Sequence, residues 1–264
     1  MERSCAETAF VHTRRAFLLR ALAAGGAAVA LPLLESPAAA DIFTPSVEDQ
    51  LAIGEQVAQQ VMLEHRTLND ERSHRFEHIG FRLLDALSVK DRGPWSYRFH
   101  LIEGKEINSF ALPGGHIFLF LGLYDRLKSD DSLAAVTGHE MTHVRKQHWA
   151  KAAGAKLKRD LVLAGVLDLT HAGVGWRAVT RIGDNILSLK YTRAEEAEAD
   201  AGGLQNMFDA GFDPQGMLEL FHVLQAAEAN AHLPPEFLMD HPLTSERIAA
   251  AQARIQQLQS SDDN

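Results

Sequence analysis

Apolar residues recur three or four positions apart along most of the chain, which predicts a mainly helical protein. Residues 47–88 carry this pattern on both sides of Asn69-Asp70, so two helices with a break between them are expected. The remaining predicted helices run from Ser129 to about Lys158, from about Thr192 to Ala210, from Pro214 to Ala229 and from Thr244 or Ser245 to about Leu258. After the last helix, the segment from Ser260 to the end is expected to fray.

Three short stretches depart from the helical pattern and predict a small sheet. Residues 95–101 alternate apolar and polar positions, which is typical of a half-buried strand and leaves His100 on the polar side, where we expect a solvated or supporting role. Residues 107–112 and 116–121 flank Pro113-Gly114-Gly115 and predict a hairpin. The hairpin is either purely structural or its first strand is an edge that pairs with extended peptide. The residues of this candidate substrate strand are Asn108, Ser109, Phe110 and Ala111.

The first forty residues have the pattern of an export signal. A twin-arginine sequence, Thr13-Arg14-Arg15, precedes a weakly hydrophobic run that ends at Ala38-Ala39-Ala40. We therefore predict a twin-arginine (Tat) signal in residues 1–40, a mature domain in residues 41–264 and a periplasmic location. The alternative is an N-terminal membrane anchor, although the apolar run is short for a membrane span.

Composition narrows the remaining choices. The chain of 264 residues is 46% hydrophobic, enough for a real core, and its formal net charge of −9 argues against a nucleic-acid surface. Cys5, the single cysteine, lies in the predicted signal, so disulfides and thiolate ligands are not expected in the mature chain. The stretch from Asp160 to Leu189 is apolar and interrupted by glycine, and its densest part, around Leu161–Leu167, is too short to span a bilayer. It predicts a core helix or, as an alternative, a mobile flap over a cleft. No integral membrane span is predicted in the mature chain, and any membrane contact would be peripheral and apolar.

The most informative motif is His-Glu-x-x-His at residues 139–143. Residues four apart share one face of a helix, so His139 and His143 can bind one metal ion while Glu140 acts on a metal-bound water. Two ordinary histidines on a solvated helix are the alternative. A catalytic zinc needs a third protein ligand, and without cysteine this must be His, Asp or Glu.

The acidic segment from Tyr191 to Asp200 is the best source of the third ligand. Its plain interpretation is a charged helix face. A sharper interpretation uses Glu196 and Asp200, which lie four apart: Glu196 would bind the metal, and Asp200 would hydrogen-bond a ligating histidine. Glu195 and Glu198 flank Glu196, so an error of register in this assignment stays open.

The chain resembles the HtpX-like and CAAX-prenyl-protease family of zinc metallopeptidases, family M48. The likeness rests on residues 108–115, 139–143 and 191–200, and it continues through Gly211-Phe212-Asp213-Pro214 and from His241-Pro242 to Arg247. It implies an α+β, zincin-like (gluzincin) domain, mostly helical with a small sheet beside the motif helix. It also implies one Zn²⁺ per chain held by His139, His143 and Glu196, with Glu140 as general base.

The same resemblance draws attention to the segment from His241 to Arg247. In periplasmic relatives a histidine of the His-Pro segment can fill the open zinc position, so His241 is expected near the zinc as a latch or as an oxyanion donor; a plain loop histidine is the alternative. Arg247 is a weaker oxyanion candidate. His148 lies five residues after His143, on the wrong helical face for the same ion, and is expected beside the ligands or at the surface.

These features predict a zinc endopeptidase whose substrates are unfolded or misassembled envelope proteins, a substrate class that comes from the resemblance. One rival is a chaperone-like binding module with latched or structural zinc and little turnover. Another is a processing peptidase of narrow specificity, which would need a shaped side-chain pocket. Glu140 favours an enzyme, because a module that only binds has no need of a glutamate beside its first ligand.

Overall fold

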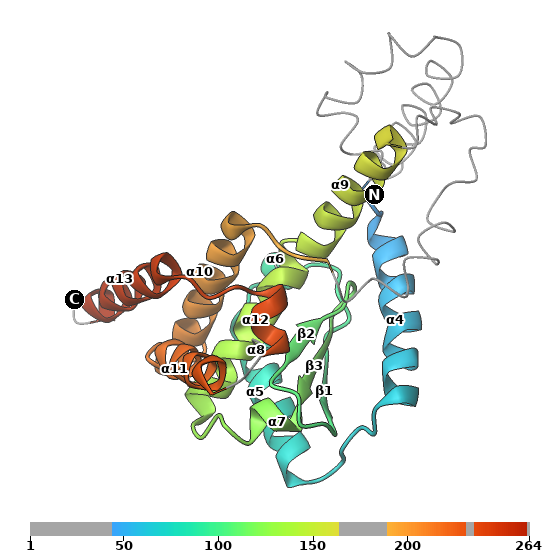
Figure 1. The fold of residues 1–264 in the computed structure, drawn as a ribbon. Coiled ribbons are helices and arrows are strands. Elements are labelled where there is room, and N and C mark those ends of the chain that lie inside the picture. The colour runs from blue at the N-terminus through green and yellow to red at the C-terminus, as the bar shows by residue number, and fades with distance from the viewer. Residues whose placement is uncertain (1–43, 164–188, 231–234, 263–264) are drawn as a thin grey trace. The chain divides into compact units, whose positions relative to one another are not determined.

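In the computed structural model, residues 44–163, 189–230 and 235–262 are described. Helices account for most of them, and three short strands lie between the second and third long helices (Figure 1). The elements are α4 (Val47–Glu64), α5 (Glu71–Ala86), α6 (Val89–Arg92), β1 (Arg98–Ile102), β2 (Ser109–Ala111), β3 (His116–Phe120), α7 (Leu121–Tyr124), α8 (Asp130–Arg145), α9 (His148–Leu163), α10 (Arg193–Asp209), α11 (Gly216–Ala229), α12 (Glu236–Asp240) and α13 (Ser245–Asp262).

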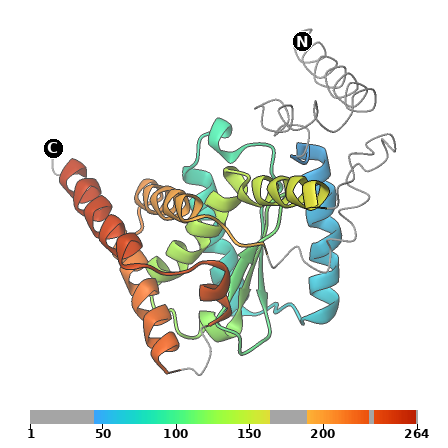
Figure 2. The ribbon, with the colours of Figure 1, turned by 45° about the horizontal axis from the view of Figure 1, so that its top comes forward.

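The strands form one mixed sheet in the order β1-β3-β2. The central strand β3 pairs in parallel with β1 and antiparallel with β2, which leaves β2 at the edge. Figures 1 and 2 show α4 along one side of the sheet and α5 and α8 on the other. The predicted hairpin is confirmed, because Gly114 and Gly115 have φ of 90° and 115° and make the turn between β2 and β3.

The hydrophobic core lies between the sheet and the helices α5 and α8, and it continues among α10, α11 and α13. The most extensive helix contact joins α8 and α10. A Cβ on Gly203 would lie 2.9 Å from the backbone nitrogen of His139, and one on Gly138 would lie 3.2 Å from the Cα of Gly203. Because neither position has room for a side chain, the backbones of the two helices touch directly beside the His-Glu-x-x-His motif.

Three helices begin where the sequence predicted a helix start or a break. Asp70 and Thr192 each make a capping box, in which the side chain accepts from the backbone of the first turn and a side chain from that turn returns the bond. Ser129 accepts a hydrogen bond from the backbone nitrogen of Ser132 at the start of α8. Gly211, with φ of 72°, ends α10 as predicted.

Two predicted boundaries are wrong. The helix that contains the motif does not continue to Lys158: α8 ends at Arg145, Gln147 takes a φ of 55°, and α9 begins at His148. The last helix does not end near Leu258 but continues to Asp262, into the segment that was expected to fray. The short helix α12 before His241 was not predicted.

The residues that carry the candidate site belong to one compact unit, formed by residues 47–149 and 185–264. Residues 1–46 and 150–184 group separately, and of these the structure describes 44–46 and the part of α9 from Ala150 onward. Among all described residues, no helix has both the length and the hydrophobicity that a membrane crossing requires. The predicted signal, residues 1–40, and most of the apolar stretch from Asp160 to Leu189 lie outside the described residues.

Candidate metal centre

Helix α8 carries the motif through the middle of the protein. Every residue from Ser132 to Val144 is buried, so polar side chains on this helix must find partners inside the protein. His139, Glu140 and His143 have exposed fractions of 1%, 1% and 2%. They therefore meet neighbouring elements rather than water.

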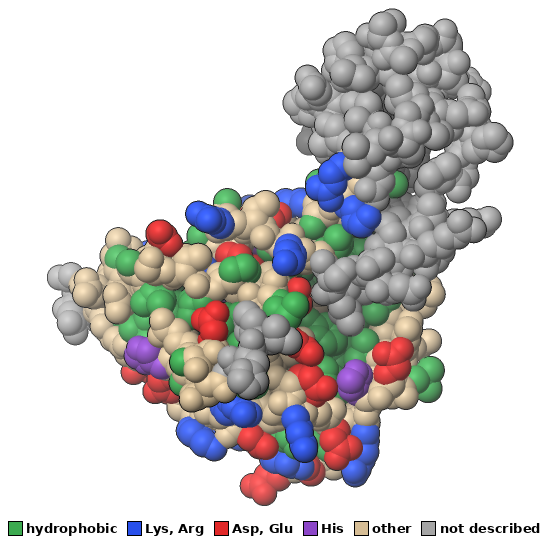
Figure 3. Space-filling model, viewed as in Figure 1, with side chains coloured by type: hydrophobic (Ala, Val, Ile, Leu, Met, Phe, Trp, Pro, Cys, Tyr) green, Lys and Arg blue, Asp and Glu red, His purple; other side chains and the backbone are tan. Residues whose placement is uncertain are grey.

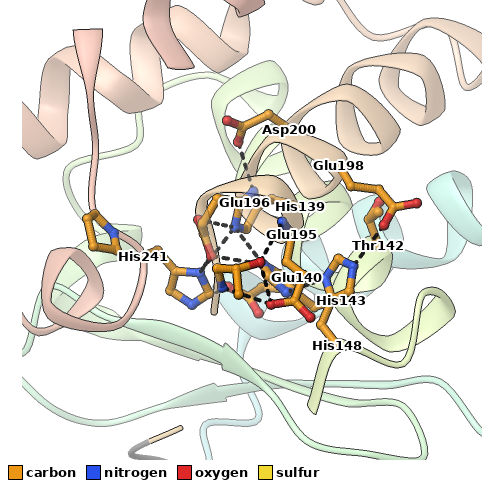
Figure 4. Close-up of polar contacts among 12 residues, drawn as sticks. His139, Glu140, Thr142, His143, His148, Glu195, Glu196, Glu198, Asp200 and His241 are labelled. Carbon is orange, nitrogen blue, oxygen red and sulfur yellow. Dashed lines mark hydrogen bonds and ion pairs between the residues drawn. The ribbon is translucent and has the colours of Figure 1, made fainter. Parts of the chain in front are cut away.

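Two other segments complete the cluster. Helix α10 brings the buried Glu196 and Asp200 against α8, and the turn between α12 and α13 brings the buried His241 (Figure 4). His139, His143, Glu196 and His241 each offer one ligand atom, and these four atoms lie within 4.8 Å of one another. The structure thus brings together the three predicted ligands and the predicted fourth residue.

Distances within the cluster fit a tetrahedral site. His139 Nε2 lies 3.1 Å from His143 Nε2 and 3.3 Å from His241 Nδ1. Glu196 Oε1 lies 2.9 Å from His241 Nδ1 and 3.5 Å from His143 Nε2. Four ligands about 2.0–2.1 Å from a zinc ion stand about 3.3 Å apart, which is the spacing found here. The cluster can therefore hold one metal ion, and its imidazole and carboxylate donors suit zinc.

The positions of the protons on His139 and His143 also fit a zinc site. Asp200 Oδ1 lies 3.0 Å from His139 Nδ1, and an ionised carboxylate can only accept, so His139 carries its proton on Nδ1. In the neutral ring, Nε2 then presents a lone pair to the cluster. Burial lowers the pKa of His143 well below its usual value, with further lowering from His139, which keeps this ring neutral as well. Two neutral imidazoles beside a carboxylate are what a zinc site requires.

Glu140 lies beside the ligands without joining them. Its carboxylate accepts from the backbone N–H of Ala111, and its Oε1 has no hydrogen-bond partner among the described residues. His241 Nε2 is 3.7 Å from that oxygen. Burial raises the pKa of Glu140 against the opposing effect of His241 and His139. A buried carboxylate with an unused acceptor and a raised pKa is suited to exchange a proton with a water molecule.

Arg247 holds the acidic side of the centre in place. Its Nε and Nη2 each lie 2.7 Å from an oxygen of Asp200, and its Nη1 lies 2.8 Å from Glu196 Oε2. Burial opposes ionisation of Asp200, but hydrogen bonds from Arg247 and His139 outweigh it and lower the pKa of Asp200. Because these contacts occupy the guanidinium, the geometry supports a positioning role for Arg247 rather than the oxyanion role considered for it.

The acidic neighbours of Glu196, which are Glu195 and Glu198, contact other residues and not the ligand cluster. Glu195 forms the capping box with Thr192. Glu198 lies 2.7 Å from Lys146 Nζ and 3.1 Å from His148 Nε2, and hydrogen bonds from these two groups lower its pKa to about 2. Only Glu196 of this acidic segment belongs to the ligand cluster. His100 contacts His116, at 3.0 Å, and is not part of the cluster.

Two aromatic residues, which the sequence did not single out, line the metal centre. Tyr191 stacks on His143 with ring centroids 4.1 Å apart, and Phe237 stacks on His241 at 4.7 Å. Both are nonlocal contacts, so no spacing rule reveals them. Arg247 was named only as an oxyanion candidate, but its need for acidic partners could have been predicted. It is the charged residue on the inner face of α13, which otherwise buries Ala251, Ile255 and Leu258, and a buried arginine needs an acidic partner.

The candidate substrate strand runs beside the motif helix. In β2 the residues that pair with β3 alternate with residues whose backbone faces outward. The Ala111 N–H faces outward and bonds Glu140, so the open edge of β2 lies toward the metal centre. Ser109 is buried and donates to the carbonyl of Phe118, Phe110 stacks on Phe118, and Asn108 donates to Glu236 at 3.4 Å.

A cavity of about 480 Å³ adjoins the centre between α10 and α13. Tyr191 and Glu196 lie in its wall, so it borders the metal cluster. Figure 3 shows hydrophobic side chains gathered over the region where α10 and α13 meet. The apolar lining comes from Ala197, Ala201, Leu204, Ala250 and Ala251.

Comparison with known proteins agrees with this geometry. Residues 70–255 match the family described as Peptidase family M48. The chain belongs to peptidase family M48. The matched span contains the whole metal cluster, the neighbouring Asp200 and Arg247, and all three strands. The predicted family is confirmed, as is a helical domain with a small mixed sheet.

Individual relatives within family M48 cover most of this chain. The beta-barrel assembly-enhancing protease of Escherichia coli K12 is 31% identical over 235 residues, which is 83% of this chain and 47% of that protein. The putative beta-barrel assembly-enhancing protease of Vibrio cholerae is 30% identical over 224 residues, 81% of this chain and 46% of that protein. Metalloprotease LoiP of E. coli K12 is 27% identical over 171 residues, 61% and 63% respectively. The chain spans about half the length of the first two relatives.

Replacing Arg247 with Met should destabilise the folded chain, because it removes the cation that pairs with Asp200 and Glu196. Asp200 and Glu196 would stay buried without their cation, which typically costs about 3–5 kcal/mol of unfolding free energy. Because the pKa of Asp200 is lowered in the folded chain, the stabilisation is present above the usual aspartate range and is lost as the pH falls through the lowered value. Urea unfolding with excess chelator, from pH 7 downward, measures both effects.

Arg254→Met is the matched control, because Arg254 lies two turns later on α13 and bonds Gln205 rather than a carboxylate. We expect this control to change stability by less than about 1 kcal/mol. An Arg247→Met protein as stable as the control at neutral pH would contradict the positioning role.

Proposed function

We propose that this chain is a zinc-dependent endopeptidase with a gluzincin-type active site, in which His139, His143 and Glu196 bind the zinc and Glu140 is the general base. One observation carries the proposal. The three ligand atoms converge at distances that suit tetrahedral zinc, and Glu140 lies beside them with an acceptor oxygen free of hydrogen bonds to the described residues. A motif that bound metal only for structure would not need that free carboxylate.

The residues divide the chemistry between them. A zinc ion held by His139, His143 and Glu196 would lower the pKa of a water molecule and polarise the scissile carbonyl. Glu140 would serve as the group that takes a proton from water and gives it to the leaving amine. Asp200 keeps the proton of His139 on Nδ1, so that Nε2 stays available as a ligand. Arg247 keeps Asp200 ionised and in place.

The open edge of β2 is the proposed substrate site. An extended peptide that pairs with the edge through backbone hydrogen bonds is held beside the metal without reading of its side chains. The cavity between α10 and α13 gives room for an apolar side chain of the bound peptide, because Ala197, Ala201, Leu204, Ala250 and Ala251 form an apolar part of a wall that also carries charged residues. Such a site favours unfolded segments, which supply extended backbone and exposed apolar side chains together.

Degradation of an unstructured protein by the zinc-loaded full chain is the direct test. We expect cleavage by the wild type and none by Glu140→Gln, which should bind zinc with the same stoichiometry. His143→Ala and Glu196→Ala, each combined with His241→Ala, should lose zinc as well as activity, since each then leaves only two of the four donors of the cluster. Metal analysis of the purified proteins separates these results. Turnover by Glu140→Gln would refute the general-base role, and full zinc content in either ligand variant would refute the ligand assignment.

His241 is proposed to act as a latch on this site. A catalytic zinc keeps one position open for water, whereas here His241 Nδ1 completes a set of four protein donors. This closure also favours the second candidate function, a binding module whose zinc turns over little substrate. Stacking of Phe237 on His241 and the short helix α12 hold the latch in the closed arrangement.

Replacing His241 with Ala distinguishes these functions. If His241 is a latch, the variant should cleave an unstructured protein faster than the wild type, because the fourth position becomes available to water. Initial rates at equal zinc content provide the measurement, with Met239→Ala as a control on the exposed face of α12. A slower variant would instead favour transition-state support by His241. Zinc-loaded protein without turnover in either form would favour the binding module.

The proposed substrates are unfolded or misassembled proteins of the cell envelope, and the proposed location is the periplasm. Relatives named beta-barrel assembly-enhancing proteases support this choice. No nucleic-acid partner is proposed, in keeping with the formal net charge of −9. Contact of the mature chain with the membrane would be peripheral.

Export by the Tat route predicts a defined mature N-terminus. We expect protein recovered from the periplasm to begin at Asp41, because Ala38-Ala39-Ala40 has the small residues that signal cleavage requires. N-terminal sequencing of the wild type, beside a variant with Arg14 and Arg15 both changed to Lys, checks the cleavage site and the route. A protein that keeps residues 1–40 in the membrane fraction would favour the anchor instead.

A further inference from the structure

A chain of polar contacts leads from one proposed zinc ligand to the protein surface. His143 Nδ1 lies 2.9 Å from His148 Nδ1, and His148 Nε2 lies 3.1 Å from Glu198 Oε2. Glu198 Oε1 in turn lies 2.7 Å from Lys146 Nζ. His148 is fully buried at the centre of this chain, whereas Glu198 is partly exposed (Figure 4).

The backbone break after α8 is what makes the contact. On a continuous helix, residues five apart differ by about 140° around the axis, so their side chains face different ways. Here Gln147 adopts a φ of 55° between the end of α8 at Arg145 and the start of α9 at His148, so the two residues do not lie on one continuous helix. The rings of His143 and His148 then meet edge to face, with centroids 4.8 Å apart. Gln50 of α4 donates to the Gln147 side chain at 3.0 Å.

The hydrogen bonds in this series of contacts all run in one direction, from His143 through His148 to Glu198. A carboxylate paired with lysine accepts hydrogen bonds, so His148 donates to Glu198 through Nε2–H. In the neutral ring, the His148 Nδ1 is then an acceptor. The proton between the two rings belongs to His143 Nδ1, and His143 Nε2 is left with its lone pair toward His139 and Glu196. Each step follows from the one before it.

We propose that His148 is a positioning residue that fixes the ring orientation and tautomer of His143 for zinc binding, with Glu198 fixing His148 in the same way. This inference rests on the proposed function, because it takes His143 to be a zinc ligand. It gives the two ligand histidines different supports. His139 donates directly to the carboxylate of Asp200. His143 donates instead to the imidazole of His148, which in turn donates to the carboxylate of Glu198.

Zinc affinity, measured by chelator competition on the full chain, tests the proposal without reference to activity. His148→Phe removes the acceptor while keeping a ring, and we expect the affinity to fall about 10–100-fold. His148→Asn places an amide oxygen where Nδ1 was, so it should recover most of the affinity. Glu198→Ala should give a smaller loss than His148→Phe. His100→Phe is the control. His100 of β1 contacts His116 of β3 and not the metal cluster, so this variant should leave the zinc affinity unchanged.

Imidazole nitrogen NMR of the zinc-loaded chain gives a second measurement. The wild type should show His143 protonated on Nδ1 and His148 protonated on Nε2. Wild-type zinc affinity in His148→Phe, or an equal loss in His148→Asn and His148→Phe, would overturn the proposal. If His148→Phe does not fold, unchanged affinity in Glu198→Ala together with a His148 proton on Nδ1 would overturn it. A wild type that binds no zinc would refute the proposed function as well, so the two failures are distinguishable.

Discussion

The direct contact between the backbones of α8 and α10 is the constraint on which the metal centre depends. Helix α8 supplies His139, Glu140 and His143, but these residues alone leave the centre without a carboxylate ligand and without an acidic partner for either histidine. Glu196, Glu198 and Asp200 all come from α10. They reach the histidines only because Gly138 and Gly203 let the two helices approach to backbone contact. Larger residues there would separate ligands that must stay about 3.3 Å apart to share one zinc.

Features that depend on local spacing could be predicted from the sequence. The four-residue spacing within His139–His143 and within Glu196–Asp200 places each pair on one helix face, and the structure brings both pairs to the same place. The break near Asp70 and the helix starts at Ser129 and near Thr192 were also predicted, and in the structure each of these polar side chains satisfies backbone groups within its own first turn. The family resemblance added His241, which no spacing rule would have selected.

Features that depend on tertiary contacts could not be predicted in the same way. The parallel pairing of β1 with β3 joins segments separated by the whole of β2, and nothing in the alternation of either strand selects its partner. The break at Gln147 was missed because a left-handed backbone is uncommon for glutamine and the surrounding residues favour a helix. The helical argument for His148 then assumed a geometry that the chain does not have: the expected position beside the ligands was right, but the reasoning behind it was not. Buried partners of Arg247 and the stacking of Tyr191 on His143 likewise arise only when distant elements pack.

The segment from His241 to Arg247 joins two functions that must be separable if the site opens. His241 closes the ligand set, while Arg247, six residues later, holds Asp200 and Glu196. Arg247 Nη1 also donates to the carbonyl of Pro242 at 2.9 Å, which ties the start of this segment to the anchored side. A movement that carried all of α13 away would remove the cation from two buried carboxylates and would be costly. A release of His241 that leaves α13 in place would displace α12, a helix of five residues, and would also break the 3.4 Å contact between Arg247 Nη1 and the carbonyl of His241.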